Sequence, residues 1–230
     1  MNEKNSIEIL AGGIAHDINN ILGVLITYPS LILAKLPKDS APYKYVEKMS
    51  RSVEELSKLS QNLAQVYREN SCILTTVDMD EMIQQLKSNW DDYVQIDLNA
   101  KNAKFLGNFE RVSTLIDNFI KNLEDGIQPS ERLKITSQVL NVEKTETPYA
   151  IIPKKEYIVL EIHSCAFIEE EHLPRVFEPF YIKKVLRRYR DGFAHALLAI
   201  SIRNIAGYLN ALNRDKETIY QIYLPLSGRK

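Results

Sequence analysis

Residues 7–32 read IEILAGGIAHDINNILGVLITYPSLI, and this stretch decides how the first part of the chain folds. Its apolar side chains recur in steps of three and four, which is the period of one buried helical face. Pro29 should kink this helix without ending it, because the apolar stripe continues past the proline. The stripe consists of Ile7, Leu10, Ile14, Ile18, Ile21, Leu25, Tyr28 and Ile32.

A second apolar stripe follows a break at residues 36–40, where proline meets cap-forming residues. The short connection predicts an antiparallel helical hairpin over residues 1–70. Because two helices cannot enclose a core, we expect two copies to form a four-helix bundle and the protein to be a homodimer. Packing of the hairpin onto the rest of the chain is the alternative. The second stripe runs through Val46, Met49, Val53, Leu56, Leu63 and Tyr67.

The pattern changes after Asn70, where β-rich runs and helical segments interleave without a regular repeat. This is typical of an α+β domain with a mixed sheet, which we expect over residues 71–230. The charged segment 141–156 is predicted to be a solvated loop. The predicted strands are 73–77, 93–98, 133–142, 157–162 and 218–224, and the predicted helices are 80–89, 110–127 and 193–206.

Composition excludes several classes of protein. The chain has 230 residues, of which 45% are hydrophobic, and a formal net charge of −1, so neither disorder nor nucleic-acid binding is expected. Two cysteines are too few for a disulfide framework, and no signal peptide is visible, which favours the cytoplasm. Residues 18–34 carry no charge, but polar side chains interrupt them, so a buried helix explains them better than a membrane span.

His16 lies two residues past Ile14, about 200° around the helix, and so faces away from the buried stripe. Asp17 can orient the imidazole or accept its proton, and Asn20 follows one turn later. Histidine is the usual carrier of protons and groups near neutral pH. The arrangement points to a functional histidine, with an ordinary surface histidine as the alternative.

Glycine is scarce, with 8 residues in the whole chain, yet Gly12, Gly13 and Gly23 flank this histidine. Each glycine inside a helix costs about 1 kcal/mol relative to alanine. Close approach of another protein's backbone to His16 would explain why glycines occur here although they destabilise the helix.

The segment Leu10–Leu22 resembles the phosphoacceptor box of bacterial two-component sensor histidine kinases. The resemblance implies that His16 is phosphorylated on its imidazole and that Asp17 assists phosphoryl transfer to the ring. It also implies that Asn20 occupies the position that, in phosphatase-competent members, places water against a phospho-aspartate. The family's phosphoacceptor domain is a helical hairpin that dimerises into a four-helix bundle.

The second half resembles the α/β sandwich that binds ATP and Mg²⁺ in the same family. Asp117–Gly126 looks like its asparagine box, with Asn122 at the metal-binding position. Glu170–Phe180 is similar to its phenylalanine box, and Ile222–Leu226 to its closing strand. With the histidine box, the resemblance covers nearly the whole chain.

Both glycine boxes of that family are altered in this chain. Glycine-rich loops bind phosphates because the missing Cβ lets backbone N–H groups approach. Bulky side chains at these positions predict that ATP and Mg²⁺ binding is lost, that no cofactor is used, and that side chains fill the vacated pocket. His163 replaces the adenine-reading aspartate, Cys165 and Phe167 replace the first pair of glycines, and Phe193, His195 and Leu197 replace the second set.

Two other clusters are weaker candidates. His163, His195 and Cys165 have the chemistry of metal ligands, but their spacing matches no zinc pattern, so no metal is expected. A basic run over residues 183–190 is predicted to be solvated or to meet an acidic partner surface, and it lacks the interleaved aromatic residues of a nucleic-acid site.

These features favour a histidine phosphotransferase of a two-component phosphorelay. His16 would take a phosphoryl group from one response-regulator receiver domain and pass it to another, without ATP. The expected partners are receiver domains, a second copy of the chain and an upstream hybrid histidine kinase. A pseudokinase adaptor or phosphatase is one alternative, and an active kinase with unorthodox nucleotide binding is another.

Overall fold

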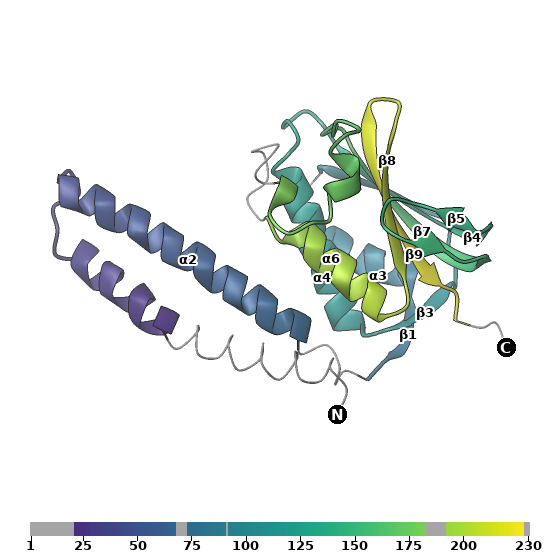
Figure 1. Cartoon of the computed structure of the whole chain (residues 1–230), viewed down its shortest axis with the longest axis horizontal. Helices are drawn as coiled ribbons and strands as arrows, with labels where there is room; N and C mark the ends of the chain where they lie inside the picture. Colours follow the sequence, from purple (N-terminus) through teal and green to yellow (C-terminus); the bar gives the residue numbers. More distant parts are fainter. Residues whose placement is uncertain (1–20, 68–72, 91, 183–191, 228–230) are drawn as a thin grey trace. The chain divides into compact units, whose positions relative to one another are not determined.

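The computed structural model describes residues 21–67, 73–90, 92–182 and 192–227. The chain divides into two compact units, Met1–Ser71 and Cys72–Lys230. The first is helical, and the second combines helices with a mixed sheet (Figure 1). The α+β class predicted for the second unit is therefore confirmed. Among the described residues, no helix combines the length and the apolar character needed to cross a membrane.

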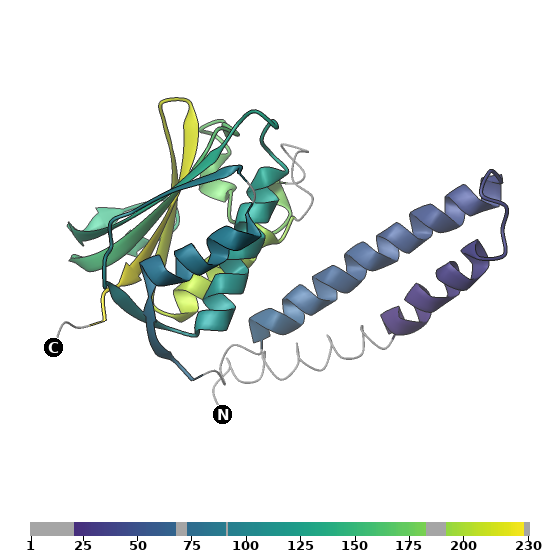
Figure 2. The same ribbon diagram turned by 180° about the vertical axis from the view of Figure 1, so that it is seen from behind.

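The first unit contains two antiparallel helices (Figure 2). One covers residues 21–33 and the other, α2, covers Ala41–Tyr67. The first helix passes through Pro29, as predicted, and the Ala34 N–H donates to the Ser30 carbonyl at 3.1 Å on the far side of the proline. Ser40 then starts α2, because its hydroxyl accepts a hydrogen bond from the Tyr43 N–H at 3.3 Å.

Within one copy of the hairpin, most of the buried side chains among the described residues are not members of the predicted stripes. Leu22 and Pro29 are buried, and on α2 so are Val53 and Ser60. Four members of the predicted stripe on the first helix are 41–63% exposed within one copy of the chain, so the burial of this stripe in a dimeric bundle stays a prediction. The helix is apolar on more than one side, and only one side can contact α2. The exposed members are Ile21, Leu25, Tyr28 and Ile32.

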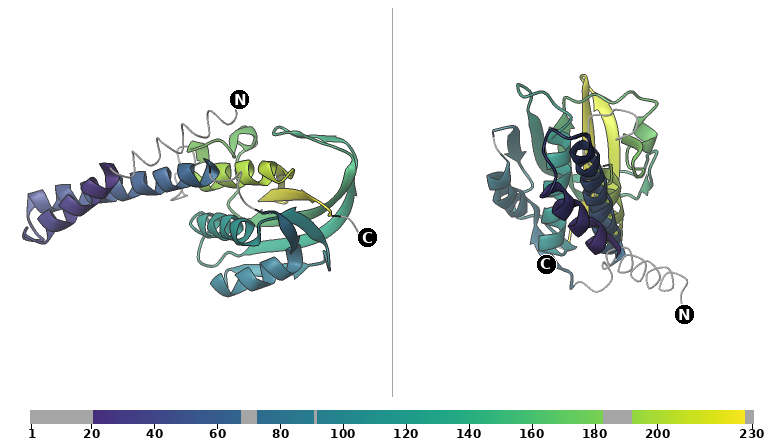
Figure 3. Two further views of the ribbon diagram at one scale, coloured as in Figure 1. Left: turned by 90° about the horizontal axis from the view of Figure 1, so that it is seen from below. Right: turned by 90° about the vertical axis from the view of Figure 1, so that its left-hand side faces the viewer.

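The core of the second unit is a five-stranded sheet in the order β2-β4-β7-β9-β8. The pair β2·β4 is parallel and the other pairs are antiparallel. Three helices cover one face of the sheet (Figure 3). The strands are β2 Val94–Leu98, β4 Leu133–Val142, β7 Lys155–Ser164, β8 Tyr208–Arg214 and β9 Glu217–Pro225, and the helices are α3 Met79–Leu86, α4 Phe109–Glu124 and α6 Ala194–Asn204.

Smaller elements complete the unit. β1 (Thr75–Asp78) pairs with β3 (Lys104–Gly107), and β5 (Thr145–Glu146) pairs with β6 (Ile151–Ile152). Single 3-10 turns cover Lys87–Asn89 and Leu173–Arg175.

Three elements differ from the sequence prediction. The segment 141–156 is not only a loop, because it carries β5 and β6 and because Ile152 is buried in a cluster with Tyr157 and Val159. Strands β3 and β8 were not predicted. β8 carries Asn210 and Asn213, which have low strand propensity, and pairing with β9 overrides that preference.

Strand alternation decides which side chains meet the helices. On β9 the Tyr220 ring packs edge-on against Phe119 of α4, with ring centroids 5.1 Å apart. Register pairs Tyr220 with Ile162 of β7, and Thr218 with Ser164. The even-numbered residues of both strands therefore face the helices, and the odd-numbered residues face the other side of the sheet.

Candidate functional site

The three residues predicted to carry chemistry, His16, Asp17 and Asn20, lie outside the described residues. Gly23, the nearest described glycine, is in a helix, and a Cβ added there would meet no atom within 4 Å. Packing among the residues that the structure describes therefore gives no reason for glycine at this position. A requirement for glycine would come from a partner that approaches the helix.

The remnant of the predicted nucleotide site lies in the second unit, between α4, α6 and β9. Asn122 of α4, at the predicted metal position, is buried, and its Nδ2 lies 3.5 Å from Nδ1 of His195. His195, in the first turn of α6, is 2% exposed and its Nε2 lies 3.3 Å from the Tyr220 hydroxyl. The structure thus brings Asn122 and His195 together, with the imidazole against the asparagine.

Aromatic rings surround the His195 imidazole. Phe119 packs against it edge-on with ring centroids 4.8 Å apart, and Tyr220 does so at 5.4 Å. Burial lowers the pKa of His195 to about 3, so the ring is neutral at physiological pH. If the Asn122 amide donates to Nδ1, then Nε2 carries the proton and donates to the Tyr220 oxygen. A neutral, apolar-packed imidazole offers no positive charge to a phosphate.

The other residues at the second glycine box are also packed inward. Phe193 directly precedes α6, is 7% exposed, and contacts the Phe180 ring with centroids 5.1 Å apart. Leu197 is 6% exposed. Neither these two residues nor His195 has a positive φ, so this turn uses backbone conformations that side chains other than glycine adopt.

The first glycine box forms a loop tied to the end of the sheet. The Ile168 N–H donates to the Thr218 hydroxyl at 2.9 Å, and that hydroxyl donates to the Asn213 side chain at 3.0 Å. Cys165 is half-buried, burial raises the pKa of its thiol, and Phe167 is exposed. The loop satisfies its polar groups with the chain's own hydroxyls and amides.

His163 does not lie with Asn122 and His195. Strand alternation places it on the opposite face of the sheet, and Ser164 is the β7 residue buried beside Thr218 on the helix-covered face. His163 therefore lies on the other face of the sheet from Asn122 and His195, and its equivalence with an adenine-reading aspartate stays a prediction.

On the outer face, His163 lies between two carboxylates. Its Nδ1 is 3.3 Å from Glu217, and its Nε2 is 3.5 Å from Glu161. The interaction with Glu161 is the largest cause that raises the pKa of His163, and the same contact lowers the pKa of Glu161. Gln221 donates to Glu161 at 2.7 Å, so this carboxylate is held on two sides.

Two of the three residues weighed as weak metal-ligand candidates, His163 and His195, do not come together. His163 and His195 are on opposite faces of the sheet, because His163 contacts Glu217 whereas His195 contacts Tyr220. Within the described parts of the chain, no three side chains of His, Cys, Asp or Glu converge as metal ligands.

Comparison with known proteins gives both a sequence relative and a fold. No family model matches the chain. The sensor kinase CckA of Brucella abortus (strain 2308) is 22% identical over 228 residues, which are 94% of this chain and 24% of the kinase. The chain therefore spans about a quarter of the length of this relative.

Two solved structures share the fold. Full-length ShkA, crystallised in complex with AMPPNP, gives a TM-score of 0.64 at 12% identity, covering 96% of this chain and 46% of that one. The histidine kinase AdeS of Acinetobacter baumannii gives a TM-score of 0.56 at 16% identity, covering 87% of this chain and 96% of that one. The chain is thus similar to sensor histidine kinases in sequence and in fold over most of its length.

Proposed function

We propose that this protein is a histidine phosphotransferase of a two-component phosphorelay that works without ATP. The observation that carries the proposal is the buried, neutral His195, which lies against Asn122 where a kinase of this fold would need room for Mg²⁺ and phosphate. The histidine box around His16 supports phosphoryl transfer, because it keeps every residue type that this chemistry needs.

In the proposed reaction, the neutral imidazole of His16 attacks the phosphorus of a receiver domain's aspartyl phosphate. A P–N bond forms, the P–O bond to the aspartate breaks, and the aspartate leaves as a carboxylate. Attack leaves a positive charge on the ring, which the Asp17 carboxylate stabilises. The second ring nitrogen then gives its proton to Asp17, which leaves a neutral phosphohistidine. The reverse sequence delivers the phosphoryl group to a second receiver.

The proposed assembly is a homodimer of the helical hairpin, in the cytoplasm, with an upstream hybrid histidine kinase as the source of phosphate. Ile21, Leu25, Tyr28 and Ile32 support dimerisation, because such apolar side chains rarely remain in water together. On α2, Tyr45 is also exposed, at 71%. A second hairpin would bury these side chains in a four-helix bundle.

A transfer assay with the full chain tests the proposal. A receiver domain carrying ³²P on its aspartate is incubated with the protein in the absence of ATP, and we expect label on the protein. His16→Gln should abolish the label, whereas His163→Gln, which removes a histidine far from the box in sequence, should retain it. Label that persists in His16→Gln would overturn the assignment of the acceptor.

Two further arms separate the alternative functions. Incubation with γ-³²P-labelled ATP and Mg²⁺ alone should give no label, and autophosphorylation there would identify an active kinase. Loss of phosphate from the receiver without labelling of the protein, reduced by Asn20→Ala but not by His16→Gln, would identify a phosphatase.

A further inference from the structure

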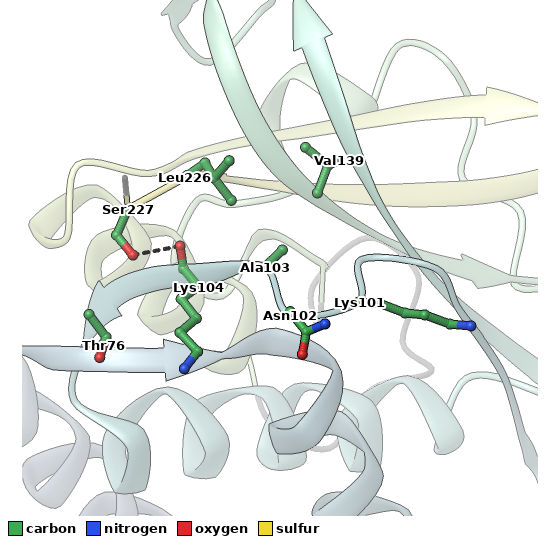
Figure 4. Close-up of a pocket in the computed structure, with 8 residues that line it drawn as sticks. All are labelled: Thr76, Lys101, Asn102, Ala103, Lys104, Val139, Leu226 and Ser227. Atoms are coloured by element: carbon green, nitrogen blue, oxygen red, sulfur yellow. Dashed lines mark hydrogen bonds between the residues drawn. The ribbon is translucent and has the colours of Figure 1, made fainter. Parts of the chain in front are cut away.

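The second unit contains a cavity of about 370 Å³ that is remote in sequence from both boxes (Figure 4). It is formed by β1, the turn before β3, the distal part of β4 and the segment that follows β9. Ligand sites in proteins typically occupy about 300–1,000 Å³. The lining residues are Thr76, Lys101, Asn102, Ala103, Lys104, Val139, Leu226 and Ser227.

The apolar part of the lining is held in place by backbone hydrogen bonds. Ala103 is 5% exposed, and Val139 and Leu226 are half-buried. The N–H and the hydroxyl of Ser227 both donate to the Lys104 carbonyl at 2.7 Å, which fixes the terminal segment against β3. The cavity is therefore preformed, and a ligand would pay little for ordering its walls.

The polar part of the lining has one sign of charge. Lys101 and Lys104 contribute two ammonium groups, and none of the lining residues is acidic. Figure 4 shows Lys104 extending beside Thr76, and Lys101 leaving the turn on the other side of Asn102. Neither ammonium forms an ion pair with a carboxylate in the described part of the chain.

The Asp78 carboxylate, which lies opposite Lys104 in the sheet, already accepts a hydrogen bond from the backbone. Asp78 lies opposite Lys104 in the β1·β3 register. Its carboxylate caps α3, where it accepts a hydrogen bond from the Glu81 N–H at 3.1 Å. The lining residues themselves thus carry two positive charges and no negative charge, and the Asp78 carboxylate is a neighbour of Lys104 outside the lining.

We infer that this cavity binds a small organic anion, a carboxylate or phosphate monoester with an apolar body. The apolar body would pack on Ala103, Val139 and Leu226, and the anionic group would meet the ammonium of one of the two rim lysines, Lys101 or Lys104. An inorganic anion would leave the apolar wall unused, and a neutral apolar molecule would leave both ammonium groups without a partner. This inference stands apart from the proposed phosphotransfer function.

A fluorine-19 NMR titration of the full chain tests the inference, with 4-fluorophenyl phosphate and 4-fluorobenzoate as probes. We expect saturable binding of one probe molecule per chain. Lys101→Gln with Lys104→Gln should weaken binding about tenfold or more, since the double variant removes every ammonium group that could contact the anion from the lining. Both lysines are exposed, so this variant should fold normally.

Matched controls separate a built site from general charge attraction. Lys134→Gln with Lys216→Gln removes two exposed charges near the opposite end of the sheet and should change affinity less than twofold. Val139→Phe should abolish binding by filling the cavity, with its fold checked by circular dichroism. Equal weakening by both lysine pairs, equal binding of neutral 4-fluorobenzyl alcohol, or no saturable binding would overturn the inference.

Discussion

The two units of this chain differ in how far their apolar side chains are buried. In the α/β unit Phe119 and Tyr220 are fully buried, and His195 fills the space next to Asn122. In the helical unit Ile21 is 63% and Tyr28 is 61% exposed. The first arrangement closes a core within one chain, whereas the second leaves apolar surface for another molecule. The comparison suggests that contacts with partners are concentrated on the hairpin.

Two glycines show the same difference at single positions. A Cβ added to Gly23 of the helical unit meets nothing within 4 Å. A Cβ added to Gly207 of the α/β unit would lie 2.7 Å from Ile202, 2.9 Å from Leu224 and 2.9 Å from the Tyr223 carbonyl oxygen. One glycine is required by the chain's own packing and the other is not.

The largest expected effect is on assembly. Leu25→Glu with Ile32→Glu places two carboxylates on exposed apolar positions that the proposed bundle would bury. We expect the dimer to weaken more than about a hundredfold, because an unpaired buried charge costs several kcal/mol. Analytical ultracentrifugation measures this. Ala41→Glu with Ser52→Glu, which adds the same charge at exposed positions of α2, should leave the dimer intact.

The same variant also tests whether the two units are independent. Trp90 is the single tryptophan of the chain and is buried in the α/β unit, so its fluorescence reports on that unit alone. Its urea midpoint should be unchanged in Leu25→Glu with Ile32→Glu. If the dimer persists in this variant, or if the wild-type protein is a monomer, the exposed apolar side chains of the hairpin are not a dimer interface.

The next effect concerns the filled nucleotide-site remnant. His195→Ala removes a fully packed ring and should destabilise the α/β unit by about 2–4 kcal/mol, as expected for a large-to-small change in a core. Urea unfolding followed by Trp90 fluorescence measures it. His172→Ala, at a partly exposed position, is the control and should cost less than about 1 kcal/mol. Similar costs for the two variants would mean that His195 is not a packing residue.

Gly207→Ala should destabilise the α/β unit by about 1–3 kcal/mol, because the new Cβ overlaps neighbouring side chains and a backbone oxygen. The same Trp90 fluorescence assay in urea detects it. An unchanged midpoint would show that the crowded site relaxes at no cost.

Gly23→Ala should have the opposite sign and stabilise the helix by about 1 kcal/mol. Thermal unfolding followed at 222 nm by circular dichroism measures the change, since the hairpin contains no tryptophan. We also expect slower phosphotransfer if Gly23 provides clearance for a receiver domain. Destabilisation by this alanine would show that a contact within the protein or its dimer already uses the space.

The smallest expected effect is the contribution of His163 to the pH dependence of the free energy of unfolding. Its pKa is raised, so its protonated form stabilises the fold. That contribution is full below about pH 6.5, the ordinary histidine pKa, and is lost as pH rises through the raised folded value. Solvent screening limits it to less than about 1 kcal/mol. Wild type should therefore lose slightly more stability than His163→Gln between about pH 6 and pH 8, in urea titrations.

Much of the fold follows from local patterns. The helix through Pro29, the strand β4 over Leu133–Val142 and the α+β class of the second unit all follow from periodicity and turn residues. The strand β8 and the β5·β6 hairpin do not, because β8 contains asparagines of low strand propensity and β5 and β6 are only two residues long, so pairing with the neighbouring strand decides their conformation.

Within the nucleotide-site remnant, replacement of the glycines is visible in the sequence. The place that each replacing side chain takes in the folded protein is not visible in the sequence. His163 and His195 both stand at family positions, yet one faces Glu217 on the outer face of the sheet and the other is buried against Phe119. Strand register decides the face of His163 on β7, whereas His195 lies on helix α6 and is buried by the packing of that helix.

The sequence by itself determined which residue types stand at the predicted histidine and glycine boxes and the amphipathic character of both helices. Only the tertiary structure decided that Leu22, and not Ile21, packs inside the hairpin, and that the His195 imidazole fills the space beside Asn122. The physical reason is the separation along the chain over which each effect acts. Periodicity and residue chemistry act over a few neighbours, whereas the partner of an apolar face or a buried imidazole is set by segments far away in the chain.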